Sequence, residues 1–442
     1  MKTYDAAIIG GGVSGLIAAI DLARANKSVI VLEKSNRMGG RAMTVNRNGA
    51  CFNLGGHAIY RAGEMHAILG ELGVKLEGGS PSPSGYAIWQ NRLMRLPGDP
   101  VRLLSSRLLS WSGKMELGRF MLGLGKIDAD AIPGVSLRDW AERQIRDPMV
   151  RHIFYALCRT ATYSKELDHQ LAGPVMKQVQ RSLGSGVLYV NGGWQTIVDQ
   201  LREQAIRAGA TVMNGKHVTE ILRDGGVSGL RFADGDSVKA DYVISTLAPA
   251  ETYRLVRDAE RTSLRRWKDS ARPVMAACLD LSLKRLPVAD RHFAIGLDQP
   301  VFFTNHSRVA KLSDHGTLVV HLIKYNGKDE SDPKADESML EQTMSLLHPD
   351  WQREVEARQF LPNITVVHDY AHIGRSDPLP GPSVPEVRGL YVAGDWVSHG
   401  EMLVDAAAAS ARRAAVQILK DMAAEGKRHA AGYPAVSAVQ IG

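Results

Sequence analysis

Three glycines near the start of the chain have the spacing found where proteins bind the diphosphate of a dinucleotide. Gly10 allows a tight turn, Gly12 lets a diphosphate approach the backbone, and Gly15 lets a helix pack closely on the preceding strand. The unpaired N–H groups at the start of that helix, around Val13 and Ser14, attract phosphate. We therefore predict a dinucleotide site at this turn.

The elements that must position these glycines are readable from the flanking residues. Apolar runs at 5–9 and 28–32 predict two parallel strands, and the pattern between them predicts a helix through residue 25. Glu33 follows the second run, where a carboxylate can accept hydrogen bonds from both hydroxyls of an adenosine ribose. A carboxylate there disfavours a 2′-phosphate, so the sequence argues against NADP at this site.

Two further segments resemble one known superfamily of flavoproteins. Residues 33–41, EKSNRMGGR, resemble the second signature of the amine oxidase, phytoene desaturase and protoporphyrinogen oxidase superfamily, and residues 389–396, GLYVAGDW, resemble its closing motif. The resemblance implies that Gly39, Gly40 and Arg41 run beside the FAD diphosphate, and Lys34 is also expected to bind the cofactor. It also implies that Gly394 and Asp395 hold the ribityl-phosphate portion.

The same resemblance implies the fold class, α/β, with a Rossmann-type (GR2-like) FAD-binding domain interleaved with a substrate domain of mixed sheet and helices. We expect residues 1–85, 186–265 and 374–442 to form the FAD-binding domain, and 86–185 and 266–373 the substrate domain. Some relatives attach flavin through a cysteine in the closing motif. Because no cysteine follows Cys278, non-covalent FAD is expected.

Several residues are expected near the flavin from their places in the family pattern. Gly55 and Gly56 would pass over the ring, and the backbone of Val218 would meet the adenine. His57 would lie at the ring edge, with a purely structural hydrogen bond as the alternative. Lys324 could hold a water against flavin N5, with a solvent-facing lysine at a strand end as the alternative.

The residues after the closing motif bear on the substrate. Aligning this segment with the amine oxidases places Leu403 where those enzymes carry a cage tyrosine. Together with Met402 and Val404 it offers an apolar wall that suits a hydrocarbon or polyene, and the chain is closest in style to the phytoene desaturase-like branch. The expected activity is removal of a hydride from an apolar, isoprenoid-like small molecule to flavin N5. An amine oxidase releasing hydrogen peroxide and a flavin-dependent isomerase remain the alternatives.

Composition narrows the classes of partner. The chain has 442 residues, 44% hydrophobic and 23% charged, with a net charge of +7 and three cysteines without a CxxC pair. These features argue for a globular protein without a disulfide framework or metal site. No basic block with interleaved aromatics is present, which argues against nucleic-acid binding. No apolar stretch reaches about 18 residues, so we expect a cytoplasmic protein; its oligomeric state is not predicted.

One segment leaves membrane contact open. Residues 101–126 have apolar residues at helical spacing and five basic residues against the single acid Glu116. A basic amphipathic helix can lie on a membrane surface. The alternative is a helix that caps the substrate cavity and turns its basic face to solvent.

The remaining patterns predict ordinary elements. They are a hairpin over 42–53, a loop over 78–85, a mostly helical stretch over 87–184, strands at 274–283, 300–303, 317–323 and 364–368, a loop over 328–338, and a closing helix over 402–424.

Overall fold

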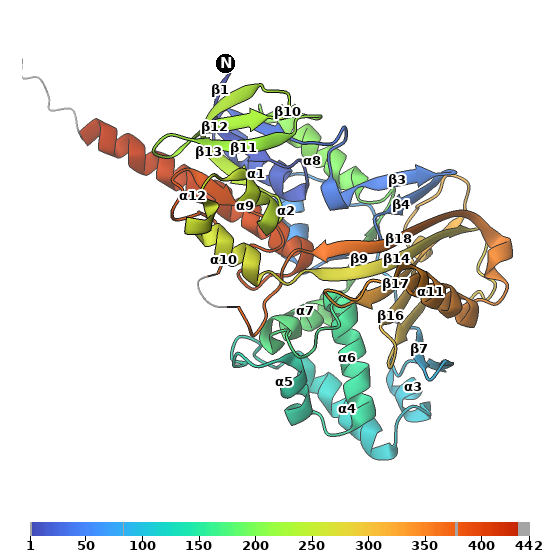
Figure 1. Cartoon of the computed structure of the whole chain (residues 1–442). Coiled ribbons are helices and arrows are strands. Elements are labelled where there is room, and N and C mark those ends of the chain that lie inside the picture. The colour runs from blue at the N-terminus through green and yellow to red at the C-terminus, as the bar shows by residue number, and fades with distance from the viewer. Residues whose placement is uncertain (1, 83, 376–378, 432–442) are drawn as a thin grey trace, which may run out of the picture.

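The computed structural model describes residues 2–82, 84–375 and 379–431, and it contains two seven-stranded sheets that lie side by side with helices packed on each (Figure 1). The first sheet carries the glycine-rich turn. Its strands are β1 (Thr3–Ile9), β2 (Val29–Leu32), β10 (Thr211–Met213), β11 (Val218–Arg223), β12 (Val227–Phe232), β13 (Ser237–Ser245) and β19 (Leu390–Val392).

The strand order of the first sheet is β10-β2-β1-β13-β12-β11, and β19 pairs with β13. The strands β10, β2, β1, β13 and β19 are parallel, whereas β12 and β11 are antiparallel additions. The apolar runs of β1 and β2 are buried because helices cover both faces of this parallel core. The predicted strand, helix and parallel strand are thus confirmed, and so is the α/β fold class.

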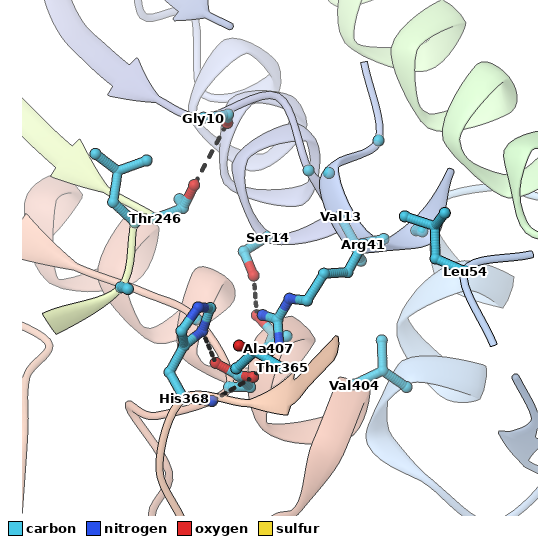
Figure 2. A pocket seen from close by; sticks show the side chains of 18 of the residues that line it. Gly10, Val13, Ser14, Arg41, Leu54, Thr246, Thr365, His368, Val404 and Ala407 are labelled. Carbon is cyan, nitrogen blue, oxygen red and sulfur yellow. Dashed lines mark hydrogen bonds and ion pairs between the residues drawn. The ribbon is translucent and has the colours of Figure 1, made fainter. Parts of the chain in front are cut away.

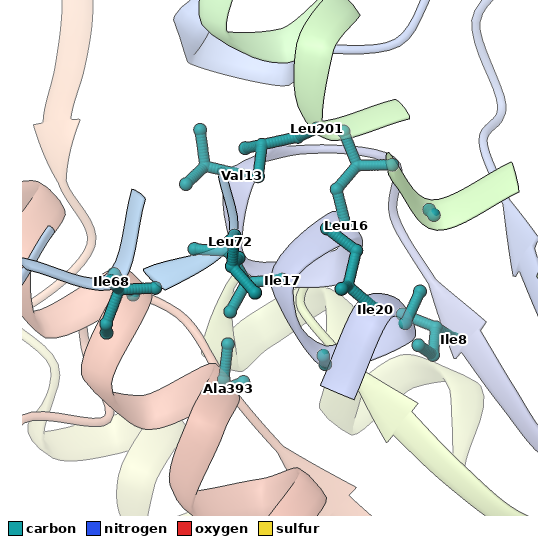
Figure 3. Packing of buried hydrophobic residues seen from close by; sticks show 14 of the residues in the cluster. Ile8, Val13, Leu16, Ile17, Ile20, Ile68, Leu72, Leu201 and Ala393 are labelled. Atoms are coloured by element: carbon teal, nitrogen blue, oxygen red, sulfur yellow. The ribbon is translucent and has the colours of Figure 1, made fainter. Parts of the chain in front are cut away.

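The helix after the glycine-rich turn, α1 (Val13–Arg24), is buried along almost its whole length. Figure 3 shows Leu16, Ile17 and Ile20 of α1 surrounded by apolar side chains from β1 and neighbouring helices. On the same face of the first sheet, α1 packs in one core with α2 (Glu64–Glu71), α8 (Gln195–Arg207) and α12 (Leu403–Ala431). The helices α9 (Pro249–Leu255) and α10 (Ser263–Ser270) pack on the other face. The closing helix therefore extends further than the predicted 402–424.

The second sheet has the order β18-β14-β17-β16-β15-β7-β8. It is mixed because β15 pairs with β7 in parallel, while the other pairs are antiparallel. Its strands are β7 (Tyr86–Trp89), β8 (Arg92–Arg95), β14 (Val274–Leu283), β15 (Phe293–Gly296), β16 (Val301–Asn305), β17 (Leu318–Asn326) and β18 (Val355–Val367). One face packs on α11 (Pro333–Leu347) and the other on the helices that precede residue 186.

Those helices form a layer at the end of the molecule opposite the labelled N-terminus (Figure 1). They are α3 (Pro100–Ser105), α4 (Trp111–Leu124), α5 (Leu137–Gln144), α6 (Pro148–Thr162) and α7 (Ala172–Ser185). The stretch 87–184 was predicted as mostly helical, but it begins with the β7–β8 hairpin. Gln90 and Asn91 form its turn with φ of 50° and 57°, and this pair is a weaker hairpin signal than Asn-Gly.

Other boundaries also differ from the prediction. The strand predicted over 364–368 begins at Val355, and two further differences have local reasons. The segment 101–126 is two helices, because Ser110 caps α4 by accepting a hydrogen bond from the Gly113 N–H at 3.1 Å. The predicted loop over 328–338 ends early, because Asp332 accepts hydrogen bonds from the N–H groups of Lys334 and Ala335, both at 3.1 Å, and so begins α11.

Short elements complete the fold. The predicted hairpin over 42–53 is present, and the predicted loop over 78–85 contains a two-residue strand that pairs with β9. These elements are β3 (Thr44–Arg47), β4 (Ala50–Asn53), β5 (Ile59–Tyr60), β6 (Gly78–Gly79), β9 (Val187–Val190) and the 3-10 turns η1 (Gly40–Ala42), η2 (Ala259–Arg261), η3 (His306–Arg308) and η4 (Trp351–Glu354). Among the described residues, no helix is both long enough and apolar enough to cross a bilayer.

Candidate active site

A cavity of about 850 Å³ lies between the two sheets, and Figure 2 shows part of its lining. At one end it meets the carboxyl ends of β1, β2 and β13, which is where open α/β sheets bind ligands. At the other end it meets β14 and β18 of the second sheet. The cavity thus joins the predicted dinucleotide site to the predicted substrate side.

The glycines of the first turn divide into packing positions and open positions. Gly10 has φ +107°, and a Cβ there would lie 2.3 Å from Thr246 Oγ1. A Cβ on Gly15 would lie 2.0 Å from the carbonyl oxygen of Gly10, so Gly15 is needed for the approach of α1 to β1. By contrast, a Cβ on Gly12 or Gly40 would meet only backbone, at 3.8 Å and 4.0 Å, and would otherwise project into the cavity.

The start of α1 favours binding of an anion. Gly12 caps α1 without a side-chain hydrogen bond, and the first turn carries no acidic residue. Ser14 Oγ donates to the Ala407 carbonyl oxygen at 3.0 Å, which brings the first turns of α1 and α12 together (Figure 2). Two helix N-termini therefore face one cavity, and their partial positive charges favour a diphosphate. Open backbone at Gly12 and Gly40, with these donors beside it, fits the dinucleotide implied by the sequence.

The acid in the first turn of α12 points away from this anion site. Asp405 is fully buried and accepts a hydrogen bond from the Met65 N–H of α2 at 2.9 Å. Burial raises the pKa of Asp405 to about 6, against the lowering effect of that hydrogen bond. Asp405 therefore links α12 to α2.

The adenosine end carries the predicted acid. Glu33 is buried, and its two carboxylate oxygens accept hydrogen bonds from the N–H groups of Gly11 and Ser35, both at 2.9 Å. Lys34, an exposed side chain, and Val218 also line this end of the cavity. The structure brings these predicted residues together, and their contacts with adenosine stay predictions.

The closing motif forms a charge cluster with the second signature. Arg41 Nη1 lies 2.5 Å from Asp395 Oδ2, and the Val366 carbonyl oxygen accepts a hydrogen bond from the same nitrogen at 2.7 Å. The backbone N–H and Nδ1 of His368 lie 3.1 Å from the same carboxylate. Burial would raise the pKa of Asp395, but the Arg41 charge and the His368 hydrogen bonds hold it well below its usual range. Figure 2 shows the side chains of Arg41 and His368 converging on one point, and Gly394 also lines the cavity.

His368 was missed by sequence reasoning. It lies just beyond β18, far along the chain from Arg41 and in a different segment from the closing motif, so no local pattern marked it. Only the folded structure, which places the end of β18 beside the closing motif, brings it to Asp395.

The glycine pair and His57 lie against the second sheet. Gly56 and His57 line the cavity, whereas a Cβ on Gly55 would lie 2.9 Å from Cys278 Sγ. The His57 nitrogens lie 2.9 Å and 3.1 Å from the carbonyl oxygens of Gly55 and Arg41. Burial lowers the pKa of His57, and a neutral imidazole has one N–H, so it donates to one of these oxygens. These main-chain contacts favour the structural alternative for His57.

Lys324 is not brought to the cavity. Its Nζ lies 2.7 Å from Asp336 Oδ1 and 2.6 Å from Asn326 Oδ1. Side chains alternate along β17, so Lys324 faces α11 while Ile323 faces Gly56 on the cavity side. The prediction that Lys324 acts beside the flavin is therefore wrong, and so is the alternative of a solvent-facing lysine, because the side chain is largely buried.

The walls at the second-sheet end are apolar. They come from β14, β18 and the start of α12, and consist of Ala276, Cys278, Ile364, Thr365, Val366, Leu403 and Val404. Leu403 holds φ at +55°, a strained value for a leucine, and lines the cavity with Val404. Met402 is buried but is not among the lining residues.

Two tyrosines complete this end, and neither was predicted to face it. Tyr60 donates to the Ala161 carbonyl oxygen and Tyr163 to the Gly56 carbonyl oxygen, both at 2.9 Å. Their hydroxyl protons are therefore engaged by the main chain. Burial raises the pKa of both phenols, so they stay neutral at physiological pH. No cluster of three or more metal-ligating side chains occurs within the described parts of the chain.

Comparison with known proteins places these motifs in one family. The family model described as flavin containing amine oxidoreductase matches residues 13–419. Bovine protoporphyrinogen oxidase is 26% identical over 324 residues, covering 64% of this chain and 68% of the relative. Phytoene desaturase of Cercospora nicotianae is 26% identical over 280 residues, covering 55% of this chain and 45% of the relative.

Solved structures share the fold at low identity. An oxidoreductase from Methanosarcina mazei superposes with a TM-score of 0.74 at 21% identity, covering 93% of this chain and 99% of that one. Putrescine oxidase bound to putrescine superposes with a TM-score of 0.72 at 16% identity, covering 95% and 99%. The fold is therefore shared with both of these proteins.

Proposed function

Because the chain belongs to the flavin containing amine oxidoreductase family and is an FAD-dependent oxidoreductase, we propose that it removes a hydride from an apolar, isoprenoid-like small molecule. The observation that carries this proposal is the uncharged second-sheet end of the cavity. Among the described lining residues, the carboxylates, lysines and arginines belong to the first-sheet side or to the Arg41–Asp395 cluster.

The apolar walls favour an uncharged substrate over a cationic one. A cationic amine bound between Ile364, Cys278 and Leu403 would lose its hydration without gaining a counter-charge, which is costly. A hydrocarbon there gains roughly 25 cal/mol for each Å² of apolar surface removed from water. Relatives named for phytoene and for protoporphyrinogen support the same direction.

The two ends of the cavity have different roles in this proposal. Bound FAD supplies a two-electron acceptor for the substrate hydride. The first turns of α1 and α12 and the open backbone at Gly12 and Gly40 would hold its diphosphate, and Arg41 would add positive charge. Ile364, Leu403 and Val404 would position the substrate and exclude water. Asp395 stays ionised and holds Arg41, so it is a positioning residue and no proton donor.

The test is anaerobic titration of the purified flavoprotein, following loss of the oxidised flavin band. The panel is a detergent-dispersed polyene, a porphyrinogen and putrescine, and oxygen is admitted afterwards. We expect bleaching by an apolar compound, and the rate of recovery in air measures whether oxygen accepts the electrons. Bleaching by putrescine alone would contradict the proposal and favour an amine oxidase. A substrate converted to a product of the same mass would favour isomerisation.

A cavity variant sharpens this test. Ile364→Asn places an amide in the apolar wall and should reduce bleaching by the apolar compound while flavin stays bound. Ile206→Asn, at an exposed position on α8, is the matched control and should bleach as the wild type does.

A further inference from the structure

The helical layer carries an apolar surface that no other part of the described chain covers. On α4, Trp111 is 67% exposed, Met115 47% and Leu122 82%. At 3.6 residues per turn these three positions fall within about 40° of one another, so they form one outward stripe. Leu117 and Leu124 lie on the opposite side of α4 and are buried in the core. The exposed Val101 and Leu104 of α3 lie on the adjoining helix.

Basic side chains surround this stripe. By helical position Lys114 and Arg119 flank it on its two sides, whereas Arg107 lies between α3 and α4 and Lys126 follows α4. Lys114 donates to the Leu104 carbonyl oxygen at 2.5 Å, while Arg107, Arg119 and Lys126 form no ion pair within the described residues. We call this surface the α3–α4 patch: Val101, Leu104, Arg107, Trp111, Lys114, Met115, Arg119, Leu122 and Lys126.

The acids of the segment do not neutralise the patch. Glu116 accepts hydrogen bonds from the backbone N–H groups of Arg146 and Asp147, at 2.7 Å and 2.8 Å, and is thereby turned toward the start of α6. Asp99 pairs with Arg102 at 3.1 Å. The exposed face is therefore apolar along its centre and cationic at its rim.

We propose that the α3–α4 patch docks the protein on an anionic lipid bilayer. Exposed Trp and Leu enter the boundary between headgroups and acyl chains, while flanking lysines and arginines meet anionic headgroups. A second copy of the chain is disfavoured as the occupant, because a symmetric contact would bring like charges together. The earlier alternative, a helix that covers the cavity with a solvated basic face, leaves the outward Trp111 and Leu122 unexplained. The proposal does not depend on the substrate proposed above.

The test is flotation of the FAD-loaded protein with vesicles of phosphatidylcholine alone or mixed with phosphatidylglycerol. We expect flotation with the mixed vesicles that weakens as salt is raised. Trp111→Ser with Leu122→Ser should lower partitioning by about tenfold or more, since two inserted side chains are lost. Arg119→Glu and Lys126→Glu should each lower it by about fivefold or more.

Matched controls separate docking from general effects of these changes. Ile206→Ser and Arg353→Glu alter an exposed apolar and an exposed basic residue elsewhere, and should float as the wild type does. Bound flavin and elution volume verify the fold of each variant. Absence of flotation with both vesicle types, or flotation unaffected by the patch variants, would overturn the proposal. A wild-type dimer that Leu122→Ser converts to a monomer would also overturn it, because a second copy would then cover the patch.

Discussion

Gly12 and Gly15 are predicted to respond differently to the same substitution, alanine, because their surroundings differ. At Gly12 the backbone has φ −80° and ψ −176°, which any residue adopts, and the nearest atom to a new Cβ is the Gly39 carbonyl oxygen at 3.8 Å. Loss of a glycine N-cap costs at most about 1 kcal/mol. Gly12→Ala should therefore leave the flavin-free protein nearly as stable as the wild type.

The same Cβ projects into the cavity where the diphosphate is expected. If the phosphate must retreat, about one charge-assisted hydrogen bond to the start of α1 is lost, worth roughly 1.5–3 kcal/mol. The dissociation constant for FAD should then rise about ten- to hundredfold.

Gly15→Ala is the matched comparison. Its Cβ would lie 2.0 Å from a backbone oxygen, that of Gly10, which cannot move without shifting β1 or α1. Overpacking of this kind costs about 1–3 kcal/mol, and it outweighs the gain of up to about 1 kcal/mol from replacing a helical glycine. This variant should lose stability even without flavin.

Thermal unfolding of the flavin-free proteins and fluorescence titration with FAD measure the two effects separately. Unchanged FAD affinity in Gly12→Ala would refute the placement of the diphosphate at the α1 start. Equal loss of stability in both variants would refute the distinction between open and packing glycines.

The other predictions concern charged groups. Because the pKa of Asp405 is raised to about 6, protonation of its carboxyl adds up to roughly 3 kcal/mol to the free energy of unfolding, a contribution that is complete below pH 4 and lost as pH rises through 6. Asp405→Asn should remove this pH-dependent contribution, which thermal unfolding of the wild type and the variant across this pH range measures. The same pH dependence in both proteins would contradict the prediction. Arg41→Gln leaves the buried Asp395 with only its His368 hydrogen bonds, and because Arg41 is partly exposed the loss should be about 1–3 kcal/mol; thermal unfolding against Arg41→Lys measures it, and a stable Arg41→Gln would contradict it. Lys324→Met should lower the free energy of unfolding by about 3 kcal/mol, because the buried Asp336 carboxylate loses its counter-charge, while substrate still reduces the flavin in the folded fraction. Loss of flavin reduction with normal stability would instead indicate that Lys324 acts beside the flavin.

The first-sheet side of the site was predictable because its residues act through local backbone geometry. Gly10, Gly12 and Gly15 specify a turn and a helix start within a few residues, and Glu33 follows the next strand at a fixed distance. Both features can be recognised from residue type and spacing alone. The strand, helix and strand were accordingly found where the sequence indicated them.

The second-sheet side was less predictable because its residues meet only through long-range pairing. Lys324 was expected at the end of a strand over 317–323, but β17 extends to Asn326, and which face Lys324 occupies depends on how β17 packs in the fold. His368 and Tyr163 reach the site from segments with no motif of their own. The β7–β8 hairpin was missed because its Gln90-Asn91 turn lacks a glycine.

The start of α12 contributes to both the first-sheet side and the second-sheet side of the cavity. It lines the cavity beside the start of α1, where we propose the diphosphate, and its first side chains, Leu403 and Val404, are part of the apolar wall. Leu403 adopts a positive φ, which costs a leucine of order 1 kcal/mol and persists only where the surroundings enforce it. A hydrogen bond from Ser14 to the Ala407 carbonyl oxygen connects this part of α12 to α1, and one from the Met65 N–H to Asp405 connects it to α2. The position of the apolar wall is therefore set by the same packing that brings the starts of α1 and α12 together, so the two ends of the cavity are one structural unit.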